Sequence, residues 1–178
     1  YLKDWELAKK FIESASILNS GDTNFSNMLS YWQARFLLID GKIDEILYLC
    51  QKVAEPVPAR ILNLHGIALY LQGDLSEAVK ILKLATSQGD FEACYNLAIV
   101  YAAGGAIEAA SEILEKISGK IVFISDPSNI WASHGYIIYK INPKENYENA
   151  DKKLKQAIDS NPENVFPYYI NAFIKEHS

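Results

Sequence analysis

The chain has 178 residues, of which 49% are hydrophobic, so it is long enough and apolar enough to bury a sizeable core. Its formal net charge of −5 and its lack of any run of lysine and arginine exclude the basic stripe that neutralises nucleic-acid phosphates, so we expect no nucleic acid as a partner. The sequence has no apolar run of about 18 residues or more, so we expect no direct membrane insertion.

The two cysteines give no sign of a cross-link or of a metal site. Cys50 and Cys94 lie far apart in the sequence, without a C-x-x-C spacing or a nearby histidine. A free cysteine of this kind behaves as a small hydrophobic residue, so we expect both to be reduced and buried. We expect no metal and no cofactor, and an intracellular, cytoplasmic location.

The first predicted element is a helix within residues 1–20. Ala8, Ile12 and Ala15 recur at spacings of four and three residues, which places them on one face of a helix. We interpret this segment as the second helix of a partial repeat, because a similar stripe of small and apolar residues recurs in the second half of each repeat that follows.

Three later segments align without gaps. They begin at Tyr31, Asn63 and Tyr95, and each start follows the previous one by 32 residues. Each segment has a small residue, a glycine seven residues later and then a second apolar stripe. The small residues are Ala34, Gly66 and Ala98, the glycines are Gly41, Gly73 and Gly105, and the stripes are Ile46/Cys50/Val53, Ala78/Leu82/Ala85 and Ala110/Leu114/Ile117. The pattern predicts a helix, a tight glycine turn and a second helix in repeats at 27–58, 59–90 and 91–127.

A fourth unit is predicted at residues 128–164. Its two helices are separated by the segment KINPKEN, residues 140–146, which predicts a turn three residues longer than in the earlier units. Residues 165–178 predict the first helix of a partial repeat, or a capping helix. The apolar run Ile121–Ile124 ahead of the fourth unit fits either a packed linker or an exposed docking strip.

These patterns resemble the tetratricopeptide repeat family, whose consensus runs Trp-x2-Leu-Gly-x2-Tyr, then Ala-x3-Phe, then Pro. The fourth unit carries the best match, in Trp131, His134, Gly135, Ile138, Ala150, Leu154, Ala157 and Pro162. The resemblance implies an all-α fold over residues 1–178, a right-handed α-solenoid of stacked antiparallel helix pairs that bury one another's apolar faces. The incomplete units at both ends imply a fragment of a longer array, or capping helices.

The histidine of this best match raises the question of catalysis. His134 stands where the family has a core leucine, and the pair His65–Gly66 occupies the equivalent place in an earlier unit. Neither histidine has a serine, a cysteine or a paired carboxylate nearby in the sequence. We therefore predict that His134 is a packed core residue, that the chain has no catalytic residue and that it is not an enzyme.

In the tetratricopeptide family the first helices of successive units line the concave side, where a peptide or helix of a partner lies. The resemblance places there Tyr31, Arg35, Asn63, Ile67, Tyr70, Tyr95, Ile99, Tyr136, Tyr139, Tyr169 and Phe173. This lining is aromatic and aliphatic, and Arg35 and Asn63 look too isolated to form the charged clamp with which chaperone-binding members grip a terminal carboxylate. Tyrosine is also the family's packing residue at such positions, so a purely structural role fits the same residues.

The leading prediction is a non-catalytic protein–protein interaction module that binds a peptide or an amphipathic helix of a partner protein in this groove. The alternative is an architectural scaffold subunit that is permanently held in a multiprotein complex, such as the cell-cycle ligase, vesicle-coat or ciliary transport assemblies that contain similar repeats. The two differ in the behaviour of the isolated chain. A module is monomeric, whereas an excised subunit self-associates through its exposed repeat ends or needs its partner.

Overall fold

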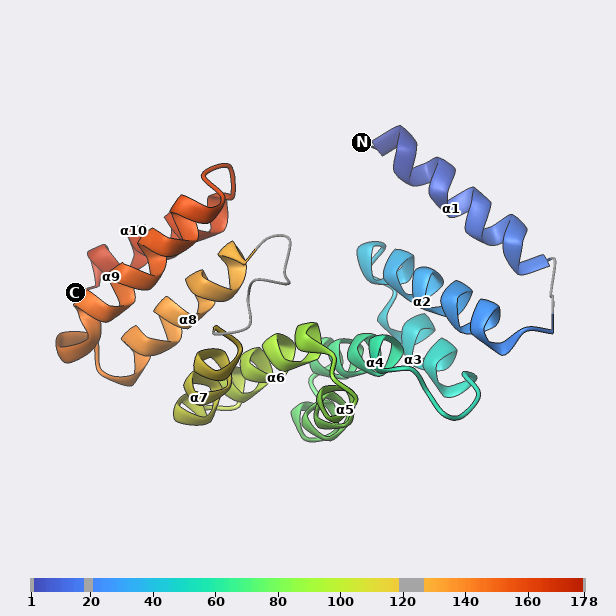
Figure 1. Cartoon of the computed structure of the whole chain (residues 1–178), viewed down its shortest axis with the longest axis horizontal. Coiled ribbons are helices and arrows are strands. Elements are labelled where there is room, and N and C mark those ends of the chain that lie inside the picture. The colour runs from blue at the N-terminus through green and yellow to red at the C-terminus, as the bar shows by residue number, and fades with distance from the viewer. Residues whose placement is uncertain (1, 18–20, 119–126, 178) are drawn as a thin grey trace. The chain divides into compact units, whose positions relative to one another are not determined.

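The computed structural model describes residues 2–17, 21–118 and 127–177, and within these ranges every regular element is an α-helix (Figure 1). The helices are α1 (Leu2–Ile17), α2 (Thr23–Ile39), α3 (Ile43–Gln51), α4 (Ala59–Gln72), α5 (Leu75–Ser87), α6 (Phe91–Ala103), α7 (Ile107–Ser118), α8 (Ser128–Ile141), α9 (Pro143–Ser160) and α10 (Val165–Glu176). The fold class is therefore all-α, as the sequence predicts. None of these helices is both long enough and apolar enough to cross a membrane.

Successive helices pair across short turns, as an α-solenoid of stacked helix pairs requires. We call α2, α4, α6, α8 and α10 the first helices, and α3, α5, α7 and α9 the second helices. The second helix packs along its first helix in the pairs α2–α3, α4–α5 and α8–α9. The repeat boundaries given above stay a prediction.

The chain divides into two compact units, residues 1–93 and residues 94–178. In the first unit α1 packs against α2, and α4 packs against both α2 and α3, so that one helix pair stacks on the next. In the second unit α7 packs against α8, and α10 lies against both α8 and α9.

The turns between paired helices use the predicted glycines. Gly73 ends α4 in the left-handed conformation, with a φ of 96°, where a side chain would be strained. Asp74 then caps α5 by accepting the backbone N–H of Glu77 at 3.0 Å. Gly41 and Gly105 repeat the positive φ at the equivalent turns, with values of 70° and 83°. The glycine spacing in the sequence therefore marks real turns.

Small residues of the first helices lie where the paired second helix comes closest. A Cβ atom on Gly66 would lie 2.5 Å from Leu82 Cγ, which is inside van der Waals contact. A Cβ atom on Gly135 would lie 3.0 Å from the carbonyl oxygen of Ala150 and 3.2 Å from Leu154 Cγ. These close approaches confirm the predicted register of the two helices in both pairs.

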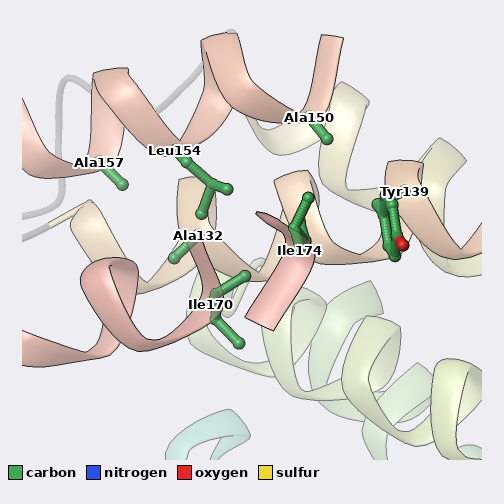
Figure 2. Close-up of a cluster of buried hydrophobic side chains, with 7 residues drawn as sticks. All are labelled: Ala132, Tyr139, Ala150, Leu154, Ala157, Ile170 and Ile174. Carbon is green, nitrogen blue, oxygen red and sulfur yellow. The ribbon is translucent and has the colours of Figure 1, made fainter. Parts of the chain in front are cut away.

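Side chains from three helices form one core of the second unit, and Figure 2 shows how they meet. The predicted stripe of α9, Ala150, Leu154 and Ala157, is fully buried. It is joined by Ala132 and Tyr139 of α8 and by Ile170 and Ile174 of α10. The corresponding core of the first unit contains Ala34, Ile46, Cys50, Ile61, Leu64 and Ala68. Helix α10 thus covers the α8–α9 pair.

The longer turn predicted in the fourth unit is wrong. Helix α8 continues to Ile141 and α9 begins at Pro143, so that Asn142 alone joins them. Asn142 caps α9 by accepting the N–H of Glu145 at 3.4 Å. Pro143 costs the helix no hydrogen bond, because the N–H of the first helical residue has no partner within the helix. The extra residues therefore lengthen the helices instead of the turn. The run Ile121–Ile124 lies outside the described residues.

Candidate functional site

His134 is a core residue, as predicted. Its side chain is 1% exposed, its Nε2 lies 3.5 Å from Glu115 Oε2, and its Nδ1 is buried with no hydrogen-bond partner in the described part of the chain. The pKa of His134 is lowered to about 4, mainly by burial and also by the Lys153 ammonium, while the Glu115 carboxylate opposes both effects. The imidazole is therefore neutral at pH 7, and its burial keeps it from contact with a substrate.

Replacing His134 by leucine should leave the fold intact and remove part of the pH dependence of stability. The unfolded chain takes up a proton on this residue near the ordinary pKa of 6.5, whereas the folded chain does so only near about 4. As the pH falls from about 7 to about 5, this difference destabilises the folded wild type by roughly 2 kcal/mol. Urea denaturation across this range should show a steeper loss of unfolding free energy in wild type than in the variant.

The control for this prediction is Gln156→Ala, which changes an exposed side chain without a titratable group and should keep the wild-type pH slope. Equal slopes for wild type and His134→Leu would contradict the assignment of a neutral, buried imidazole.

The two cysteines are both free thiols. Cys50 is a buried free thiol, as predicted, and burial raises its pKa to about 11, so that it stays protonated at pH 7. Cys94 is also a free thiol but is only half-buried. The prediction that both cysteines are buried is therefore right for Cys50 alone.

Aromatic and cationic side chains gather around Tyr31 in the first unit. Its ring meets that of Trp32 edge to face, with the centroids 5.3 Å apart. Arg35 donates a hydrogen bond from Nη1 to the Tyr31 hydroxyl at 2.9 Å, and its Cζ lies 5.7 Å and 5.6 Å from the centroids of Tyr31 and Trp32. Arg60 of α4 places its Cζ 5.9 Å from the Tyr31 centroid. We call these four residues the Tyr31 cluster.

Two pockets adjoin the Tyr31 cluster, and both are lined by Tyr31, Trp32 and Arg60. The larger has a volume of about 600 Å³ and extends to Arg35, Ala59 and the segment 88–92. The smaller has a volume of about 350 Å³ and is completed by Asn24, Asn27, Met28, Pro58 and Ile61. The cluster therefore contributes to two pockets, of which the larger has the more polar lining and the smaller the more apolar one.

Another hollow of the first unit, of about 460 Å³, lies between α1, α2 and α3. Its apolar lining includes Ile12 and Tyr48, and its Lys9 is already ion-paired with Asp40. Because its cation already has a partner, this hollow offers a ligand less specific recognition than the Tyr31 cluster does.

Two residues predicted to line a binding groove are buried instead. Asn63 and Tyr139 are each 3% exposed, so a partner cannot contact their side chains in this conformation. Asn63 lies on α4, which is covered by α2, α3 and α5. Tyr139 belongs to the core of the second unit, and its hydroxyl donates to the carbonyl oxygen of His177 at 2.7 Å.

The other predicted groove residues differ in accessibility. Ile67 and Tyr70 in the first unit and Tyr95 and Ile99 in the second are half-buried. The Tyr95 hydroxyl lies 3.1 Å from Ser133 Oγ, and burial raises the pKa of this tyrosine. A partner therefore reaches these residues only at their exposed edges, and their role in binding stays a prediction.

Aromatic residues also gather between α8 and α10. The ring of Phe173 meets that of Tyr136 edge to face at 5.9 Å and stacks on His177 at 4.3 Å. Tyr136 and Phe173 therefore pack α10 against α8. Tyr169 on the same helix is 68% exposed and remains available to a partner.

Sequence reasoning missed two members of the Tyr31 cluster, Trp32 and Arg60. Arg35 is not isolated, because Arg60 of the neighbouring first helix lies against the same ring. One signal was present in the sequence, since Arg35 and Arg60 are its only two arginines.

A comparison with protein-family models matches residues 69–121 to a family described as Tetratricopeptide repeat. The matched residues run from the end of α4 through α5 and α6 and along α7. A comparison with curated proteins gives no match.

Proposed function

Since the chain is a helical-repeat protein of the tetratricopeptide repeat family, which serves protein–protein interaction, we propose that it binds a peptide or an amphipathic helix of a partner protein along its first helices. The proposed module is non-catalytic. The binding residues are those of the predicted lining whose side chains are accessible, joined by Trp32 and Arg60.

The observation that carries this proposal is the Tyr31 cluster with its two pockets. Trp32 is 37% exposed, and Met28 one turn earlier on α2 is 48% exposed. Large, partly exposed aromatic side chains beside pockets are the usual anchors of protein interfaces, because each buries much apolar area on binding. Helices α2 and α4, which carry the cluster, pack against each other.

The alternative, a permanently held architectural subunit, is supported by apolar side chains on α1 and α10. On α10, Val165 is 79% exposed and Tyr168 is 46% exposed, and on α1, Phe11 is 65% exposed and Ile17 is 83% exposed. Apolar surface of this kind favours a permanent neighbour. The Tyr31 cluster favours the binding module, because its pockets and its cations offer specific recognition in addition to apolar area.

Truncating Trp32 to alanine should weaken partner binding about ten- to a hundredfold, because a central aromatic anchor typically contributes about 1–3 kcal/mol. The experiment uses the wild-type chain as bait to isolate partner proteins, and then measures the dissociation constant of the main partner by titration calorimetry. Circular dichroism of the variant would verify that it folds.

The matched control is Tyr48→Ala, which removes an aromatic side chain that is 60% exposed on the second helix α3. This variant should bind like wild type. If Tyr48→Ala weakens binding and folded Trp32→Ala does not, the second helices carry the interface and the proposal is wrong.

A further inference from the structure

The only two arginines in the sequence lie against one tyrosine ring beside two pockets. We propose that Arg35 and Arg60 bind the carboxylate of an aspartate or glutamate side chain in the partner segment, while a neighbouring large apolar side chain of that segment enters the smaller pocket. This inference rests on the proposed function and specifies the partner's chemistry.

The pairing of charges elsewhere on the surface supports this assignment. Lysines form exposed ion pairs with carboxylates, such as Lys80 with Glu77 at 2.7 Å and Lys155 with Asp151 at 2.6 Å. In contrast, neither Arg35 nor Arg60 has a carboxylate at ion-pair distance within the described ranges. The two guanidinium groups are therefore available to pair with a carboxylate of an external partner.

Arginine is also the cation that suits this geometry. Its planar guanidinium stacks on an aromatic ring and still presents N–H groups at its edge, where a carboxylate binds through two parallel hydrogen bonds. Arg35 is held in place by its hydrogen bond to Tyr31 and by the ring of Trp32, so little side-chain entropy is lost on binding. Two positive charges on one ring repel each other, and an anion bound to both relieves this repulsion.

The pockets indicate how the partner chain runs. The two pockets share Tyr31, Trp32 and Arg60 and otherwise have different linings, so a segment that fills both contacts these residues along its length instead of ending at them. This arrangement suits a side-chain carboxylate within the segment better than a terminal carboxylate. Met28 and Ile61 give the smaller pocket the apolar surface that a leucine or an aromatic side chain requires.

Two carboxylates in the lining of the larger pocket limit how many acidic residues the partner segment carries. Asp90 and Glu92 lie there, and Asp90 accepts the N–H of Ala93 at 2.9 Å as the cap of α6. A second acidic residue of the partner beside the first would face these carboxylates and be repelled. We therefore expect a single acidic residue next to a large apolar one, and not an acidic run.

The test uses a random library of short peptides displayed on phage and selected on the wild-type chain. The selected peptides are synthesised with acetylated and amidated ends, and in a second form with a free carboxyl end. Both forms are titrated against wild type, the double variant Arg35→Gln/Arg60→Gln, Trp32→Ala and the control Lys83→Gln on α5. We expect the peptides to share one acidic residue beside a large apolar residue. The arginine variant should bind them at least about tenfold more weakly, whereas Lys83→Gln should bind like wild type. Changing the acidic residue of the peptide to its amide should cause a similar loss with wild type and little further loss with the arginine variant.

Three outcomes would overturn the inference. Peptides without an acidic residue that bind the folded arginine variant normally, but lose affinity for Trp32→Ala, would disprove the acidic partner and leave the proposed function standing. Peptides that bind only with a free carboxyl end would show that a chain terminus occupies the site. If the selected peptides bind the arginine variant and Trp32→Ala as tightly as they bind wild type, both the inference and the proposed function fail.

Discussion

Replacing Gly66 by leucine should lower the free energy of unfolding by about 2–3 kcal/mol, because a Cβ atom alone would lie 2.5 Å from Leu82 Cγ and 2.7 Å from its Cδ2. This loss should outweigh the gain of up to about 1 kcal/mol that leucine brings over glycine inside a helix. Urea denaturation of wild type and variant measures the difference.

The companion change Leu82→Ala separates overpacking from other effects. Leu82 is fully buried, so Leu82→Ala alone should also be destabilising, by about 2–5 kcal/mol. In the double variant Gly66→Leu/Leu82→Ala the new leucine takes up part of the vacated space, so the two losses should be less than additive. Strict additivity, or an unchanged stability of Gly66→Leu, would mean that α4 and α5 do not meet at these residues.

Replacing Leu154 by alanine should lower the free energy of unfolding by about 2–5 kcal/mol, because it opens a cavity among α8, α9 and α10. Leu154 is fully buried. It lies on α9 between Ala150 and Ala157 (Figure 2), and these small neighbours leave little scope for the core to collapse around the missing atoms. Guanidinium denaturation, followed by circular dichroism, measures the loss.

The matched control is Gln156→Ala, on the exposed face of the same helix, which should change the stability by less than about 0.5 kcal/mol. If both substitutions have the same small effect, the stripe of α9 does not pack as the structure shows.

Much of the fold could be predicted from the sequence because two physical constraints recur every 32 residues. A turn in the left-handed conformation favours glycine, as at Gly73, and a close contact between helices admits only a small residue, as at Gly66. The length of the fourth turn was predicted wrongly because this turn does not contain a glycine. Asn142 caps α9 by itself and Pro143 opens the helix, so no glycine marks the turn.

The site was harder to predict because burial depends on every neighbour of a helix. Asn63 occupies the repeat position equivalent to Tyr31, yet it is buried because α2, α3 and α5 all pack against α4. Tyr139 is buried in the core that α10 completes, and its hydroxyl bonds to His177 just after that helix, a contact that local periodicity does not reveal. That Arg35 and Arg60 lie against the same ring likewise depends on how α2 and α4 stack, which spacing along the sequence does not specify.

The central claim, that a partner binds along the first helices at the Tyr31 cluster, is tested most directly by amide hydrogen exchange of the chain with and without a selected peptide. A bound segment contacts α2 and α4, so their amides around Tyr31 and Arg60 should exchange more slowly in the complex, whereas those of α3 and α5 should be unchanged. Slowing confined to α3 and α5, with α2 and α4 unaffected, would contradict the claim.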